Sequence, residues 1–126
     1  MREMEDDEGN ETMLVLDNAA MVEGVGATEE AFEHAVSLAA SIARTLLARG
    51  YRVGLVTRDA EIRPEGGPGQ LTRVMRLLST LGRVGQGGEH TFRPQLDAGV
   101  VHARIRITPG KPAVVEQPFD LMRRPA

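Results

Sequence analysis

Residues 12–58 read TMLVLDNAAMVEGVGATEEAFEHAVSLAASIARTLLARGYRVGLVTR, and this stretch decides the fold. It opens with four consecutive apolar residues, 13–16, a pattern typical of a strand buried on both faces of a parallel sheet. A long apolar segment follows, and residues 53–57 then form a second apolar run. Because a helical crossover between two strands favours a parallel, right-handed connection, we predict one βαβ unit here.

The segment between the two strands predicts a helix from Thr28 to Arg49. The hydroxyl of Thr28 can accept a hydrogen bond from a first-turn amide, and Glu29 and Glu30 lie at the positive end of the helix dipole. Gly50 is the expected left-handed residue that ends the helix. Apolar residues at helical spacing widen into a broad stripe, so the helix should pack against the sheet. They include Phe32, Val36, Ala39, Ile42, Ala43, Leu46 and Leu47.

The segment after the second strand predicts an edge strand and a second helix. Residues 60–64 are short and end in a proline, which suits an antiparallel edge strand. Residues 65–69 form a glycine-rich turn in which Pro68 is placed for the first turn of a helix, and Gly82 is the expected end of that helix. Its predicted apolar face consists of Leu71, Val74, Met75, Leu78 and Leu81.

The remaining segments predict loops and two further strands. We expect a loop over residues 21–27 and a polar, glycine-rich linker over residues 85–94. Residues 101–108 alternate apolar and polar side chains, the period of a half-exposed strand. Residues 108–112 predict a turn, and residues 113–115 a short final strand.

Length and composition indicate one small domain. Residues 1–11 carry six acidic side chains and predict a solvated lead-in, residues 12–116 the domain, and residues 117–126 a weakly patterned tail. Cysteine is absent, which excludes disulfides and thiolate metal sites. The net charge of −3 and an aromatic content of 3% argue against nucleic-acid binding. With no long apolar run to suggest a membrane span, the expected location is the cytoplasm.

Four segments carry a resemblance to a known family. They are residues 2–5 (REME), 14–17 (LVLD), 32–40 (FEHAVSLAA) and 49–56 (RGYRVGLV). In combination they resemble the bacterial domain-of-unknown-function family fifty-eight. Members of that family carry a von Willebrand factor A-like domain and often sit beside genes for MoxR-type AAA+ ATPases. The resemblance covers roughly residues 1–84.

The resemblance implies a three-layer α/β domain of Rossmann-like type, in which helices flank a mostly parallel sheet. With the four predicted strands 12–17, 53–57, 60–64 and 101–108 numbered along the chain, it implies the strand order 3-2-1-4. A chain of 126 residues is short for a complete A-type domain, so we expect a truncated sheet. Truncation would leave an exposed edge near residues 101–108, through which a homodimer could form.

The same resemblance points to a degenerate metal-ion-dependent adhesion site. A-type domains build that site on Asp-x-Ser-x-Ser after the first strand, whereas residues 17–21 here read DNAAM. Both serine positions are apolar, and residues 107–110 (ITPG) have a proline where a later aspartate is expected. Hard cations need clusters of oxygen ligands, so Asp17 is left as the one candidate ligand for Mg²⁺, and no cofactor is expected. We favour the interpretation that Asp17 hydrogen-bonds the amides of its own loop.

The position of these residues still marks a site, because open α/β sheets bind ligands in the crevice at the carboxyl ends of their parallel strands. The residues expected to gather there are Asp17, Asn18, Met21, Thr57, Arg58 and Thr108. Elsewhere, Glu30 and His34 are spaced as a possible ligand pair on the first helix but lack a third ligand, so a surface or partly buried histidine is the favoured interpretation.

By the resemblance, the expected function is that of a non-enzymatic protein-interaction module. It would serve assembly or regulation alongside a MoxR-type AAA+ ATPase, and would bind through shape and through apolar or arginine contacts. One alternative is a small-ligand or nucleotide-binding α/β protein that uses the crevice near Asp17. Another is that the chain is a fragment of a longer reading frame without a separate activity.

Overall fold

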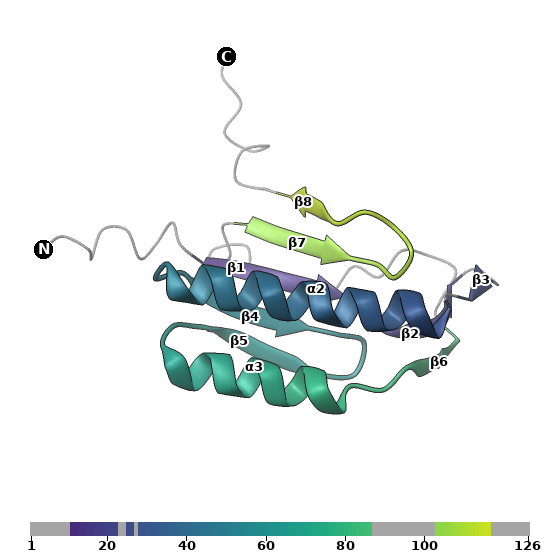
Figure 1. The fold of residues 1–126 in the computed structure, drawn as a ribbon, viewed down its shortest axis with the longest axis horizontal. Coiled ribbons are helices and arrows are strands. Elements are labelled where there is room, and N and C mark those ends of the chain that lie inside the picture. The colour runs from purple at the N-terminus through teal and green to yellow at the C-terminus, as the bar shows by residue number, and fades with distance from the viewer. Residues whose placement is uncertain (1–10, 23–24, 27, 87–102, 117–126) are drawn as a thin grey trace, which may run out of the picture.

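The computed structural model describes residues 11–22, 25–26, 28–86 and 103–116 (Figure 1). The predicted tail over residues 117–126, nearly all of the acidic lead-in, and residues 87–94 of the predicted linker lie outside the described residues. The elements in chain order are β1 (Glu11–Leu16), β2 (Ala19–Val22), β3 (Val25–Gly26), α2 (Glu29–Ala48), β4 (Arg52–Val56), β5 (Glu61–Glu65), α3 (Pro68–Thr80), β6 (Val84–Gln86), β7 (Ala103–Ile107) and β8 (Val114–Glu116).

The main sheet has five strands in the order β5-β4-β1-β7-β8. The central strand β1 pairs in parallel with β4 on one side and β7 on the other, while β5 and β8 add antiparallel edges. The predicted βαβ unit and the order 3-2-1-4 are therefore confirmed. The predicted free edge at residues 101–108 is wrong, because β8 pairs with β7 through Arg104–Glu116, Ile105–Val115 and Arg106–Val114.

Both described helices pack against one face of this sheet (Figure 1). Successive side chains of a strand point to opposite faces, so alternate residues of β1, β4 and β7 meet the helices. The resulting core contains Leu14, Leu16, Val53, Leu55 and Ile107 from the strands, and Ala35, Ala39, Ala43, Val74 and Leu78 from the helices. Met13, Val15 and Val56 form a second buried cluster on the other face. No described helix covers that face, so the part that the structure describes is a helix layer on a sheet.

Helix α2 is delimited by the two signals expected from the sequence. Thr28 is the N-cap, and its hydroxyl accepts a hydrogen bond from the Ala31 amide at 2.9 Å. At the other end Gly50 has φ +92°, where a side chain would be strained. The Gly50 and Tyr51 amides donate to the carbonyls of Leu47 and Leu46, which is the Schellman arrangement.

The edge strand β5 carries a bulge that the sequence did not reveal. Its pairing with β4 shifts between Val53 and Leu55, and Gly54 fits there because an added Cβ would lie 2.6 Å from the Ile62 carbonyl oxygen. The side-chain amide of Gln70, at the start of α3, donates to the Val53 and Arg63 carbonyls at 2.6 and 2.9 Å. A buried glutamine thus provides hydrogen bonds where the strand pairing is irregular.

Helix α3 and the segment after it differ from prediction in two respects. The helix begins with Pro68 as predicted, but it ends at Thr80 with Leu81 as an extended cap, so Gly82 does not terminate it. A second, three-stranded sheet then forms in the order β3-β2-β6, where loop and linker had been expected. Its parallel pairing of β2 with β6 brings the chain after α3 beside the chain after β1.

Candidate functional site

Asp17 lies directly after β1, at the carboxyl end of the central strand. Its amide donates to the Ile107 carbonyl at 3.0 Å, which extends the pairing of β1 with β7 by one residue. Its buried carboxylate accepts a hydrogen bond from the Ala19 amide at 3.1 Å. The prediction that Asp17 hydrogen-bonds an amide of its own loop is therefore confirmed.

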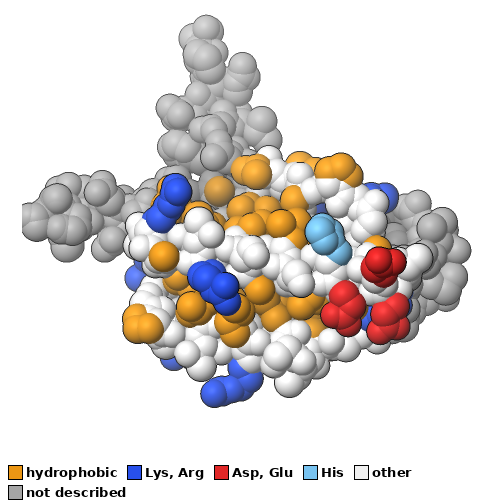
Figure 2. Space-filling view, in the orientation of Figure 1, with side chains coloured by type: hydrophobic (Ala, Val, Ile, Leu, Met, Phe, Trp, Pro, Cys, Tyr) orange, Lys and Arg blue, Asp and Glu red, His pale blue; other side chains and the backbone are white. Residues whose placement is uncertain are grey.

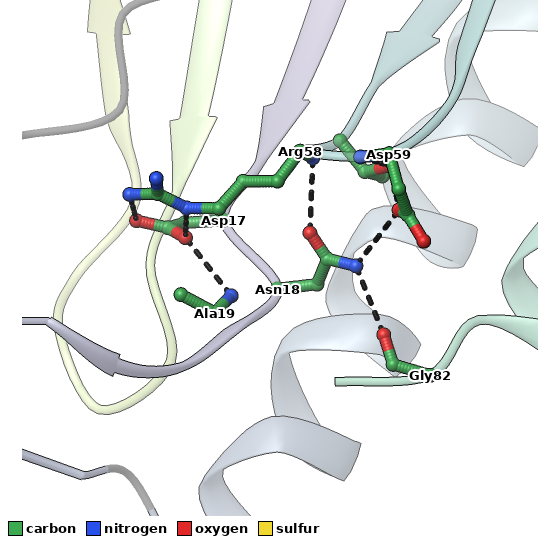
Figure 3. Close-up of polar contacts among 7 residues, drawn as sticks. Asp17, Asn18, Ala19, Arg58, Asp59 and Gly82 are labelled. Carbon is green, nitrogen blue, oxygen red and sulfur yellow. Dashed lines mark hydrogen bonds and ion pairs between the residues drawn. The ribbon is translucent and has the colours of Figure 1, made fainter. Parts of the chain in front are cut away.

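A guanidinium holds the same carboxylate from the other side (Figure 3). Arg58, which follows β4, donates from Nε to Asp17 Oδ1 at 2.6 Å and from Nη2 to Oδ2 at 3.1 Å. The two side chains are only 18% and 7% exposed, so water screens this bidentate pair little. The hydrogen bond to Asp17 raises the pKa of Arg58, burial opposes the rise, and the negative charge of Asp17 adds to it.

Asn18 connects three parts of the fold from a fully buried position. Its Oδ1 accepts a hydrogen bond from the Arg58 backbone amide at 3.0 Å. Its Nδ2 donates to Asp59 Oδ1 at 3.1 Å and to the Gly82 carbonyl at 2.9 Å (Figure 3). One side chain therefore joins the end of β1, the turn after β4 and the segment after α3.

The turn after β4 contributes Thr57 and Asp59. The Thr57 hydroxyl donates to Asp59 Oδ1 at 2.9 Å and accepts from the Asp59 amide at 3.3 Å, while the Thr57 amide donates to the Ala60 carbonyl at 2.8 Å. Asp59 was not among the residues predicted for the crevice. The available signal was its place two residues after Thr57, since aspartate commonly bonds the backbone in a tight turn.

The structure brings together four of the six predicted crevice residues: Asp17, Asn18, Thr57 and Arg58. Thr108 follows Ile107, whose carbonyl binds the Asp17 amide, and its own carbonyl accepts the Lys111 amide within the predicted turn. Met21 lies in β2, where its backbone pairs with Gly26 and Gln86 in the second sheet. The side chains that converge therefore lie at the ends of β1 and β4.

The donor set around Asp17 does not fit a hard divalent cation. Both carboxylate oxygens already accept hydrogen bonds from the Arg58 guanidinium. The positive charge of that guanidinium would repel a cation at the same carboxylate. Among the described residues, no group of three or more histidine, cysteine, aspartate or glutamate side chains could hold a metal ion. Mg²⁺ requires several oxygen ligands in near-octahedral geometry, which this paired carboxylate does not offer.

An open hollow of about 400 Å³ lies at a different place on the surface. It is formed where the amino end of α2 meets the turn between β7 and β8. Its lining residues are Thr28, Glu30, Ala31, His34, Gly110 and Lys111. None of the predicted crevice residues belongs to this lining.

Comparison with known proteins identified no relative. A scan against protein-family models found no matching family, and searches of curated proteins and of solved structures found no match. No helix within the described ranges is both long and apolar enough to cross a membrane. The geometry of the polar groups at the strand ends is therefore the structural basis for a functional proposal.

Proposed function

We propose that this chain is a non-enzymatic protein-interaction module of the von Willebrand factor A-like type, and that its strand-end crevice works without a bound cation. The observation that carries this proposal is the bidentate pair between Asp17 and Arg58. A module that binds its partner through a metal bridge needs a carboxylate cluster open to the cation. Here the Asp17 carboxylate at the end of β1 is already paired with the Arg58 guanidinium of the same chain.

The polar groups of the crevice support an interaction role over a catalytic one. Asp17, Asn18 and Thr57 are buried, and each is hydrogen-bonded to a neighbouring group of the chain. A catalytic or ligand-binding site instead presents convergent polar groups to its substrate. The network is thus suited to hold the ends of β1 and β4 in one fixed shape, against which a partner protein would pack.

The proposed partner is a MoxR-type AAA+ ATPase, as the resemblance of residues 1–84 implies. The module would serve assembly or regulation of that ATPase. Contact would depend on shape and on apolar or arginine side chains, since arginine favours protein interfaces through its planar, multidentate guanidinium.

A capture experiment tests this proposal. The full chain is immobilised, and a purified MoxR-type AAA+ ATPase from the source genome is passed over it in buffers containing either Mg²⁺ or EDTA. We expect equal capture in both buffers, and weaker capture by Arg58→Gln than by the control Arg76→Gln, whose side chain is exposed on α3. The ATPase itself binds nucleotide with Mg²⁺, so capture that requires Mg²⁺ and is also lost in Asp17→Ala would overturn the cation-free site. No capture in either buffer would overturn the choice of partner.

A further inference from the structure

We draw no further inference here: the strongest candidate, the open hollow between the amino end of α2 and the turn between β7 and β8, lies at a helix amino terminus among exposed acidic and histidine side chains (Figure 2), and nothing within the described residues points to a ligand that it would hold.

Discussion

At the scale of single residues, the site depends on how a few buried polar groups are paired. Asp17 binds Arg58 through both carboxylate oxygens, and Asn18 binds groups from two further segments of the chain. Unpaired, these groups would be costly to bury, whereas paired they fix the relative positions of the strand ends. The identity of residue 58 thus decides what the carboxylate of Asp17 can bind.

Replacing Asn18 should destabilise the whole domain. Asn18→Ala leaves the Arg58 amide and the Gly82 carbonyl without their side-chain partner, and we expect the free energy of unfolding to fall by about 1–3 kcal/mol. Urea unfolding followed by circular dichroism measures the change. Thr72→Ala, on the exposed surface of α3, is the control and should change it little. An unchanged value for Asn18→Ala would show that the network contributes no stability.

Replacing Arg58 should cost stability by an amount that does not vary around neutral pH. Arg58→Gln leaves a buried carboxylate without its charged partner, with an expected loss of about 1.5–3 kcal/mol. Because the pKa of Arg58 is raised on folding, the contribution of the pair is fully present below the unfolded-state pKa. It is lost only as the pH rises through the folded-state pKa, in the strongly alkaline range. Urea unfolding of both proteins should therefore give a constant difference from neutral to mildly alkaline pH, and a difference that shrinks over this range would contradict the assignment.

At the scale of helices and strands, the sequence predicted those features that depend on residues close together in the chain. The buried strands β1 and β4, the cap at Thr28 and the left-handed Gly50 follow from residue types within a few positions of each other. The bulge in β5 and the role of Gln70 were missed, because a helix glutamine that donates to carbonyls of two separate strands has no local signature. The second sheet was missed for the same reason, since it joins residues 19 and 84.

Filling the space at Gly54 should disturb the bulge. In Gly54→Ala the new Cβ would lie 2.6 Å from the Ile62 carbonyl oxygen and 2.8 Å from the Pro64 nitrogen, so the backbone must shift. We expect a loss of about 1–3 kcal/mol in the free energy of unfolding. The matched control is Gly69→Ala in α3, where a Cβ meets nothing within 4 Å and the change should be neutral or stabilising. Equal effects of the two substitutions on the free energy of unfolding would show that the bulge accommodates a Cβ at position 54 without strain.

At the scale of the whole molecule, the sequence predicted the connectivity of the main sheet better than its edges. The order of four strands was correct, and four of the six crevice residues converge as expected. Asp59 and the Gly82 carbonyl were missed because their contribution depends on how the turn after β4 and the segment after α3 meet Asn18. Within the described ranges the outermost strand on that side is β8 rather than β7, because residues 114–116 return to pair with β7.

The central claim is that the site at the strand ends works without a cation, because the Arg58 guanidinium is bound to the Asp17 carboxylate. The most direct test is thermal unfolding of the full chain with and without millimolar Mg²⁺ or Mn²⁺. A ligand that binds the folded state raises the melting temperature. We predict no metal-dependent rise for the wild-type chain, with isothermal titration of Mn²⁺ as the check for weak binding. A metal-dependent rise that disappears in Asp17→Ala would contradict the account, because it would mean that a cation displaces Arg58 from the carboxylate.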